Sequence, residues 1–414
     1  MKVLMVNNFH YPRGGGERVY LELSSLLQAH GHEIIPFSTQ HELNLPTEYA
    51  GSFVSETDFP SFLGRKNSLG SKLQVAERVV YSRESKRRIE KLIEESRPDI
   101  AHLHGIAHYL SPSILPAIKK AGLPIVMTLH DYKLICPNSS FLSKGEVCER
   151  CKMRRYYNVI LRQCKRDSFS ASLLAGIEMY VHKLLQIYER NVDVFIAPSK
   201  FLGDKMRDYG IKNAIVHIHN FVDTESFTPQ FSAGEYAIYF GRLSQEKGVK
   251  TMLEAMKLLD SFRLHIAGTG PSEGDLRAFA NEHTLSNVTF HGHLSQQELI
   301  PLIQGAAFTL VPSEWYENYP MTILESFACG VPVIVSDIGA LPGLIHDSRN
   351  GLLFPPGDAM QLAEKMQFLV NNPTKAIAMG RNGYEEIKSN NNPEKHYTQT
   401  IDLYQNLLDS KSDA

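Results

Sequence analysis

The sequence predicts an α/β protein with two domains, each built around a parallel β-sheet. Short apolar runs of strand length alternate with longer amphipathic stretches of helix length along the whole chain, and such alternation is typical of βαβ units. The 414 residues exceed what one compact core holds and suggest two domains of roughly 200 residues each. With 43% hydrophobic and 21% charged residues, the composition excludes disordered and fibrous proteins.

The first domain, residues 1–227, begins with a strand, a glycine turn and a helix. Residues 3–6 form the apolar strand, residues 14–16 form the glycine turn, and apolar side chains then recur at helical spacing until Gly31. Further elements expected in this domain are a helix at 85–96 and strands at 34–37, 100–103, 124–129 and 194–197.

The second domain, residues 228–393, repeats this architecture. Its expected strands lie at 236–240, 263–267, 288–290, 308–311 and 331–335, with stretches of helix length between them. A last helix is expected in residues 394–414, after Pro393, and we expect it to pack back toward the first domain.

Charge and hydropathy narrow the class of protein. A formal net charge of −2 argues against a surface built for nucleic acid, so we expect no nucleic-acid partner. The apolar start of the chain is too short for a signal peptide, and no stretch approaches the roughly 20 apolar residues of a membrane span. We therefore expect a cytoplasmic protein.

The window most informative about function runs from Ser313 to Glu325. Glu317 and Glu325 stand eight positions apart, across an expected loop-to-helix junction near Tyr319. The unpaired N–H groups of a helix start can bind a phosphate, and carboxylates accept hydrogen bonds from sugar hydroxyls. Two carboxylates at this spacing occur on many exposed helices, but the flanking Pro-Ser-Glu and Ala-Cys-Gly-Val-Pro-Val-Ile make the pattern specific.

These residues resemble the donor-site signature of retaining glycosyltransferases of family 4, which have the GT-B fold. Other segments match the family in order along the chain, namely 12–18, 98–105, 128–131, 241–248, 267–271 and 291–294. The resemblance implies two Rossmann-like domains facing each other across a cleft, with the acceptor in the first and a nucleoside diphosphate sugar in the second. It also implies transfer of a hexose to a glycan or polyprenyl-linked acceptor, in the assembly of a cell-surface polysaccharide.

The resemblance assigns roles in the second domain. Arg242 and Lys247 follow a strand closely enough to converge on one diphosphate, although the same spacing fits a solvated basic loop. Glu325 would bind the ribose hydroxyls and Glu317 a hydroxyl of the transferred sugar, although both could be surface carboxylates. The remaining donor contacts that it implies are the backbone of Asn318 and Tyr319 and the glycine loops at Gly241, Gly268 and Gly292.

In the first domain, His130 ends a strand, at the position where open α/β sheets bind ligands. The family places a histidine here beside the transferred sugar, whereas a lone histidine at a strand end is more often structural. Gly15 and Gly16 would let the donor diphosphate or the acceptor approach the backbone, or would form a plain turn. His102 and His104 are expected to be framework residues.

The implied reaction retains the anomeric configuration and needs no metal cofactor. The chain has no Asp-x-Asp, the pattern with which other glycosyltransferases hold a divalent ion on the diphosphate. Arg242 and Lys247 would replace that ion, and the leaving phosphate would accept the proton of the incoming hydroxyl. Alternatives on the same fold are a nucleotide-sugar epimerase, a sugar phosphorylase or a non-catalytic nucleotide-sugar-binding protein.

A basic segment of the first domain carries Cys136, Cys148, Cys151 and Cys164. The spacing allows a tetrahedral structural zinc site, and it equally allows four reduced thiols. Basic side chains in this domain could make peripheral contact with an anionic inner membrane surface, or could be ordinary solvated helix faces. They are Arg150, Lys152, Arg154, Arg155, Arg162, Lys165 and Arg166 in the cysteine segment, and Arg83, Lys86, Arg87, Arg88 and Lys91 before it.

Overall fold

The computed structural model describes residues 1–56, 69–259 and 262–412. Its internal contacts divide the chain into two units. The first unit comprises Met1–Lys144, Cys148–Ile218 and Tyr397–Ala414, and the second comprises Gly145–Val147 and His219–His396. The division falls at Ile218, ahead of the expected domain end at residue 227, and most of the last helix belongs to the first unit.

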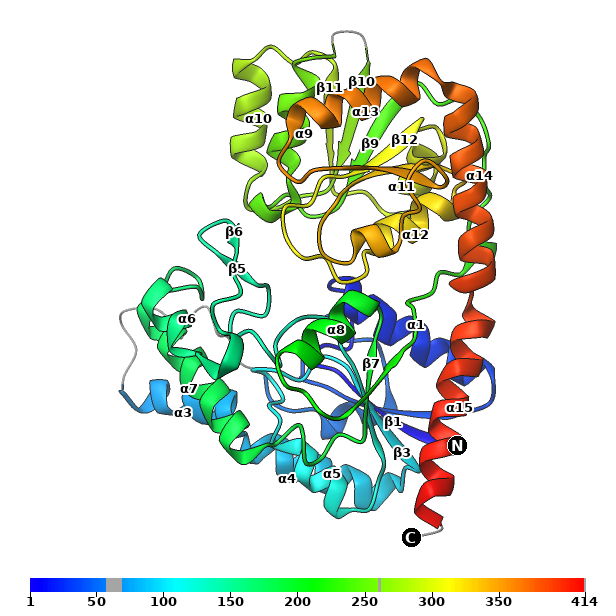
Figure 1. The fold of residues 1–414 in the computed structure, drawn as a ribbon. Helices are drawn as coiled ribbons and strands as arrows, with labels where there is room; N and C mark the ends of the chain where they lie inside the picture. Colours follow the sequence, from blue (N-terminus) through cyan, green and yellow to red (C-terminus); the bar gives the residue numbers. More distant parts are fainter. Residues whose placement is uncertain (57–68, 260–261, 413–414) are drawn as a thin grey trace. The chain divides into compact units, whose positions relative to one another are not determined.

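The first unit is built on a six-stranded sheet in which every neighbouring pair of strands runs parallel (Figure 1). In order across the sheet, its strands are β2 (Glu33–Phe37), β1 (Lys2–Val6), β3 (Ile100–Leu103), β4 (Ile125–Thr128), β7 (Val194–Ala197) and β8 (Ala214–His217). Val3, Leu4, Met5 and Val6 of β1 are all fully buried, because helices cover both faces of the sheet, as parallel sheets require.

The helices of the first unit are α1 (Gly15–Ala29), α3 (Leu69–Tyr81), α4 (Arg83–Ser96), α5 (Ile114–Lys120), α6 (Tyr157–Arg162), α7 (Phe169–Leu185) and α8 (Lys200–Asp208). The hairpin strands β5 (Leu142–Ser143) and β6 (Glu146–Val147) lie between α5 and α6 in the sequence. Short 3-10 turns occur at η1 (Glu48–Ser52), η2 (Lys152–Arg154), η3 (Thr224–Ser226), η4 (Gln245–Lys247) and η5 (Leu341–Gly343).

The second unit repeats the parallel six-stranded sheet. In order, its strands are β11 (Val288–Gly292), β10 (Arg263–Ala267), β9 (Tyr236–Phe240), β12 (Phe308–Val311), β13 (Val333–Ser336) and β14 (Gly351–Phe354). Its helices are α9 (Val249–Met256), α10 (Glu273–Glu282), α11 (Gln296–Gln304), α12 (Met321–Ala328), α13 (Ala359–Asn371) and α14 (Pro373–Asn390).

Alternate residues of the second sheet enter two separate cores. Ala237 and Tyr239 of β9 pack in the core that includes helices α9 and α13, whereas Ile238 and Phe240 pack in the core that includes α12. This alternation follows from the two-residue repeat of a strand. Helices therefore cover both faces of the sheet, and the predicted α/β class is confirmed in both units.

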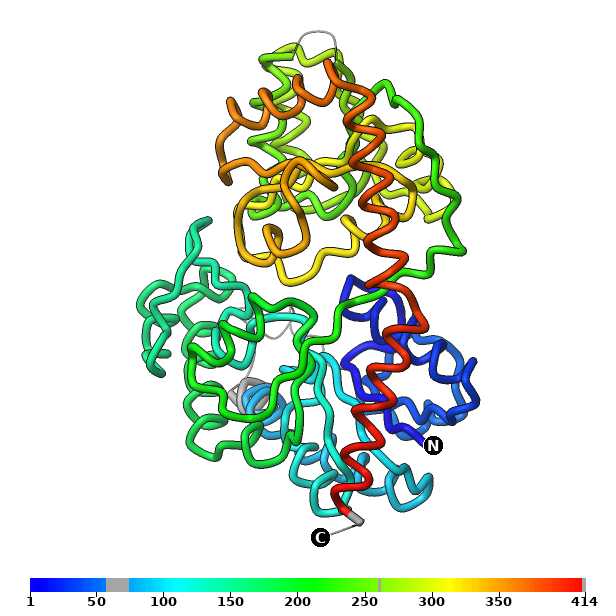
Figure 2. Tube along the Cα trace, turned by 45° about the vertical axis from the view of Figure 1, so that its right-hand side comes forward, coloured from blue at the N-terminus to red at the C-terminus, as the bar shows by residue number. Residues whose placement is uncertain are grey.

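The C-terminal helix α15 (Pro393–Ser412) attaches the end of the chain to the first unit. Tyr404 is fully buried, and its hydroxyl lies 2.5 Å from Nδ1 of His102 in β3. The hydroxyl of Tyr397 lies 2.9 Å from Nε2 of His32. Segments from opposite ends of the sequence thus lie side by side within this unit (Figure 2).

Two edge strands were not expected from the sequence. Every residue of β8 is exposed or only partly buried, so its composition lacks the apolar run that marks a central strand. Strand β14 is mostly buried, but a polar loop precedes it and Gly351 opens it. Both strands are recognisable only once their neighbours β7 and β13 provide hydrogen-bonding partners.

No helix in the described ranges combines the length and the apolar content needed to cross a bilayer.

Candidate active site

The site predicted in the second unit lies at the carboxyl ends of adjacent strands. Strand β9 leads into Gly241 and Arg242, β10 leads into Gly268, and β12 leads into the loop that carries Glu317. The chain crosses from one side of β9 to the other between β11 and β12, so the carboxyl end of β9 is a topological switch point. Ligands of open α/β sheets bind at such points.

Backbone packs against backbone where these loops meet. Gly268 has φ +132°, and a Cβ on it would stand 1.9 Å from the carbonyl oxygen of Gly241. Gly248 has φ +65°, and a Cβ there would stand 1.8 Å from the carbonyl oxygen of Pro312. The N–H of Gly241 donates to the carbonyl of Ala267 at 3.0 Å. Only glycine fits either position, so these residues fix the distance between the loops.

Lys247 and Glu317 form an ion pair across these loops. Nζ of Lys247 lies 2.6 Å from Oε1 of Glu317, and the hydroxyl of Ser313 donates to the same oxygen at 2.7 Å. Nζ of Lys247 also lies 5.3 Å from the ring centroid of Trp315, within cation–π range. The sequence singled out both charged residues but did not predict that they contact each other.

Glu317 is 5% exposed, yet it is held in its ionised form. Burial alone would raise the pKa of its carboxyl group, but the ammonium charge of Lys247 and the hydrogen bonds from Lys247 and Ser313 outweigh burial and lower it. Ser313 was part of the predicted window without a role. Its position four residues before Glu317 and two residues after β12 is the signal that could have identified it.

Arg242 presents its guanidinium to solvent. Its side chain makes no hydrogen bond or ion pair with any residue that the structure describes, while its backbone carbonyl accepts a 2.8 Å hydrogen bond from the hydroxyl of Tyr239. The backbone is therefore anchored and the cationic group is open to a ligand. Such an arrangement suits an anion more than a structural ion pair.

The loop after Glu317 leads into the buried helix α12. Tyr319 is 7% exposed, and its hydroxyl accepts a 2.6 Å hydrogen bond from Nδ2 of Asn391. Its backbone N–H donates to no residue in the described part of the chain, so this N–H is available to a ligand. Asn318 precedes it in the same loop. Glu325 lies one turn into α12 and is 9% exposed. This burial argues against the alternative interpretation of Glu325 as a surface carboxylate.

Gly292 ends β11 at the edge of this arrangement. Its carbonyl accepts a 2.6 Å hydrogen bond from the N–H of Gly268. The predicted nucleotide loops at these two glycines are therefore in direct contact.

In the first unit, His130 follows β4 and packs against the first turn of α1, which begins at Gly15. A Cβ on Gly16 would stand 3.2 Å from Cγ of His130, whereas one on Gly15 would meet nothing within 4 Å. Nε2 of His130 lies 2.8 Å from Nδ1 of His104. Burial lowers the pKa of His130 to about 4, so the imidazole is neutral at physiological pH.

His130 is the last of three stacked histidines. The ring of His104 lies 5.0 Å from that of His130 and 4.7 Å from that of His102. Nε2 of His102 lies 2.7 Å from the hydroxyl of Thr128, and its Nδ1 contacts Tyr404 of α15. The C-terminal helix thus anchors the histidine row, and the expected framework role of His102 and His104 agrees with these contacts.

The four clustered cysteines do not form a metal site in this structure. All are free thiols, and the described residues contain no group of three or more His, Cys, Asp or Glu side chains placed to hold a metal ion. Cys136 is buried in the core of the segment while the other three are half-buried. Burial, followed by the charges of the other three thiols, raises the pKa of Cys151 to about 12. The thiols are neighbours without ligand geometry, and the zinc prediction therefore gains no support.

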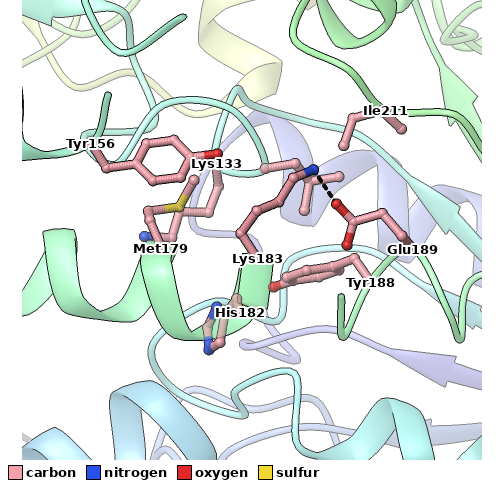
Figure 3. A pocket seen from close by; sticks show the side chains of 9 residues that line it. Lys133, Tyr156, Met179, His182, Lys183, Tyr188, Glu189 and Ile211 are labelled. Carbon is pink, nitrogen blue, oxygen red and sulfur yellow. Dashed lines mark hydrogen bonds and ion pairs between the residues drawn. The ribbon is translucent and has the colours of Figure 1, made fainter. Parts of the chain in front are cut away.

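A small cavity in the first unit lies beside α7 (Figure 3). Met179, His182 and Lys183 of α7 line it, together with Lys133, Leu134, Tyr156, Tyr188, Glu189 and Ile211. Lys183 and Glu189 form an ion pair at its wall. None of the predicted site residues lines this cavity.

Comparisons with known proteins match both halves of the chain. The model described as "Glycosyltransferase Family 4" matches residues 13–226, and the model "Glycosyl transferases group 1" matches residues 223–386. An uncharacterized glycosyltransferase of Methanocaldococcus jannaschii is 30% identical over 200 residues, 48% of this chain and 55% of the relative, so the match spans about half of that protein. Glycogen synthase of Mycobacterium tuberculosis is 24% identical over 98% of this chain and 94% of its own.

Solved structures share the fold. Sucrose-phosphate synthase from Thermosynechococcus elongatus superposes with a TM-score of 0.72 at 21% identity, over 99% of both chains. Anabaena HepE, solved in complex with UDP, superposes with a TM-score of 0.66 at 16% identity, over 98% of this chain and 100% of its own. These similarities establish the two-domain GT-B fold.

We predict that Glu317→Gln flattens the acid dependence of stability. The folded-state pKa of Glu317 lies below the ordinary 4.5, so its contribution to the free energy of unfolding is fully present above that pH and is lost as pH falls through the folded-state pKa. The variant should be less stable near neutral pH by about 1–3 kcal/mol, because the charged hydrogen bonds weaken. The difference from wild type should shrink as the pH is lowered below 4.5 in denaturant titrations.

The matched control is Glu282→Gln, an exposed carboxylate of α10. It should follow the wild-type stability at every pH. Equal stability of Glu317→Gln and wild type across this range would show that the ion pair does not hold the loop.

Proposed function

Because the chain belongs to glycosyltransferase family 4 and has the GT-B fold, we propose that it transfers a sugar from a nucleoside diphosphate sugar to an acceptor hydroxyl, with retention and without a catalytic metal. The observation that carries the proposal is the cationic site of the second unit. There Lys247 pairs with Glu317 and Arg242 stays open, at the switch point of the sheet. That HepE was solved with UDP-glucose supports the class of donor.

The reaction breaks the bond between the anomeric carbon and the diphosphate, so negative charge grows on the leaving phosphate. Arg242 and Lys247 would bind that phosphate, and their charge stabilises the transition state more than the ground state. The incoming hydroxyl forms the new glycosidic bond on the same face, and its proton passes to the leaving phosphate. No side-chain base is needed in this scheme.

The ion pair between Lys247 and Glu317 would be exchanged for contacts to the donor when the donor binds. In this structure each group satisfies the other, so neither charge is buried alone. When the donor binds, the diphosphate would compete for Lys247, and the freed Oε1 of Glu317 would accept a hydrogen bond from a hydroxyl of the sugar. Donor binding would then exchange one set of charge-assisted hydrogen bonds for another.

Other residues would position the donor and acceptor. Glu325 would accept hydrogen bonds from the ribose, and the N–H of Tyr319 would bind the diphosphate or sugar. His130 is neutral, so it can donate to or accept from a sugar hydroxyl without adding charge near the developing oxocarbenium ion.

The acceptor we propose is a glycan or a polyprenyl-linked precursor, handled by the first unit. No observation favours an epimerase or a phosphorylase. A turnover assay with the donor alone separates these classes, because an epimerase converts its nucleotide sugar without an acceptor.

We predict that Arg242→Ala lowers kcat by about 100- to 1000-fold, the usual loss when one group that stabilises transition-state charge is removed. Because Arg242 is exposed and its side chain has no described partner, this variant should keep the wild-type melting temperature. The double variant Lys247→Met, Glu317→Gln tests Lys247 without leaving the carboxylate of Glu317 buried and unpaired. It should lose at least as much activity as Arg242→Ala.

Lys250→Ala is the control for this test, since Lys250 is an exposed lysine of α9 in the same neighbourhood of the sequence. It should retain wild-type turnover. Near wild-type turnover of Arg242→Ala would remove that residue from the phosphate site.

We predict that Glu325→Gln weakens binding of the free nucleoside diphosphate by roughly 10- to 100-fold, the loss expected for hydrogen bonds to a charged group. Isothermal titration with uridine, guanosine and adenosine diphosphates would also identify the base. Glu364→Gln, an exposed helix carboxylate in α13, should bind as wild type. Unchanged affinity in Glu325→Gln would contradict the ribose role.

We predict that chelation of divalent ions leaves the initial rate unchanged, because cationic side chains occupy the place of the metal. The measurement is transfer with and without a chelator, followed by addition of magnesium or manganese. An immediate loss of activity that magnesium restores would overturn the metal-independent mechanism.

A further inference from the structure

We propose that helices α6 and α7 of the first unit form a docking surface for an anionic lipid bilayer. The inference rests on the proposed function only in that a polyprenyl-linked acceptor would lie in such a bilayer. The docking itself is argued from exposure and charge on the described residues.

Helix α7 carries a row of exposed apolar side chains. Phe169, Leu173, Ile177, Tyr180 and Leu184 are 57%, 37%, 46%, 41% and 84% exposed. We call these five residues the α7 stripe. They recur every three or four residues, so they share one face of the helix. In a helix that meets only water, this face would be polar.

The opposite face of α7 is held by buried charges. Nζ of Lys133 lies 2.6 Å from Oε2 of the fully buried Glu178, and Nδ1 of His108 lies 3.4 Å from Oε1. Nε2 of His182 lies 2.8 Å from the carbonyl oxygen of Val80. Rotating the helix to bury the stripe would break this network and leave Lys133 unpaired, which is strongly unfavourable. The apolar face is therefore kept outward.

Helix α6 extends the same surface. Gly176 of α7 faces Val159 and Ile160, and a Cβ there would stand 3.3 Å from each side chain. The backbone N–H of Tyr157 donates to the hydroxyl of Tyr180 at 3.2 Å. Beside this contact, the side chains of Met153, Tyr157 and Leu161 are 77%, 47% and 74% exposed.

The charge of the segment that precedes α7 indicates which partner covers the α7 stripe. Residues 150–170 contain seven basic residues and one acidic residue, a net charge of +6, and Arg154, Arg155 and Arg166 are exposed. Two copies of the chain meeting through this face would bring two such segments together, which is repulsive. An anionic lipid surface instead attracts the basic side chains while the α7 stripe enters the interface, as in other helices that lie on membranes.

Helix α4 is a weaker candidate for membrane contact than its basic residues suggest. Residues 83–96 contain five basic and four acidic residues, a net charge of +1. Arg88 pairs with Glu84 at 2.9 Å and Lys91 with Glu95 at 3.6 Å, both within the helix. These contacts are those of a solvated helix face. Of the two basic segments named from the sequence, the proposal therefore keeps the cysteine segment and leaves out α4.

The test measures cosedimentation of the full chain with vesicles of phosphatidylcholine alone or mixed with phosphatidylglycerol. Wild type should bind the mixed vesicles and bind the neutral ones weakly. The triple variant Leu173→Ser, Ile177→Ser, Leu184→Ser should bind the vesicles roughly tenfold or more weakly, because it removes apolar area that docking on the bilayer would bury. The double variant Arg154→Glu, Arg155→Glu should lose binding to the mixed vesicles only.

The control carries serine at three exposed apolar positions of the second unit, Leu258, Met360 and Phe368. It should bind vesicles as wild type does. All variants should keep the wild-type melting temperature, because the positions changed are exposed. Transfer to a water-soluble acceptor should be unchanged in the stripe variant, so loss of docking and failure of the proposed reaction give different results.

Undiminished vesicle binding by the triple variant would overturn the proposal. So would a wild-type dimer in light scattering that the triple variant converts to a monomer, since the stripe would then be an interface between copies.

Discussion

Parallel strands end at one edge of their sheet, and the candidate active site depends on this constraint. It brings Arg242, Gly268 and Glu317, from three separate parts of the sequence, to neighbouring strand ends. The glycines then allow the loops to approach until backbone contacts backbone, so that Lys247 can reach Glu317 at 2.6 Å. Without that approach the carboxylate would be buried without a cation, at a cost that a marginally stable fold does not tolerate.

In the second unit a buried carboxylate stays charged, whereas in the first unit burial keeps a histidine neutral. Three stacked histidines lie in a row that ends at His130, and burial keeps His130 neutral. Their outer partner is Tyr404, near the C-terminus, so the last helix contributes to the geometry of a residue at the end of β4. The candidate residues of the second unit are therefore charged, whereas the candidate residue of the first unit is a neutral polar group.

Helix α7 shows how a buried network decides what a surface can do. Glu178 is ionised in the interior because the ammonium group of Lys133 pairs with it, while the neutral imidazole of His108 lies 3.4 Å from its other oxygen, and these contacts orient the helix. The consequence appears on the other side, where five apolar side chains face outward beside a segment of high positive charge. One face of α7 therefore carries a stabilising buried network, and the opposite face carries the proposed docking surface.

The sequence by itself determined the α/β class and most central strands, and it supplied the candidate residues for a donor site, because apolar periodicity and the spacing around Glu317 and Glu325 are local properties of the chain. It did not determine the edge strands β8 and β14, which have no strong apolar pattern. Nor did it show that Lys247 pairs with Glu317, that Gly16 packs on His130, or which face of α7 is exposed. It left open whether the four clustered cysteines hold zinc, and the described residues show no group placed to hold a metal ion. These outcomes belong to the tertiary structure, because each depends on the distance between groups remote in sequence, and that distance exists only after the sheets have assembled.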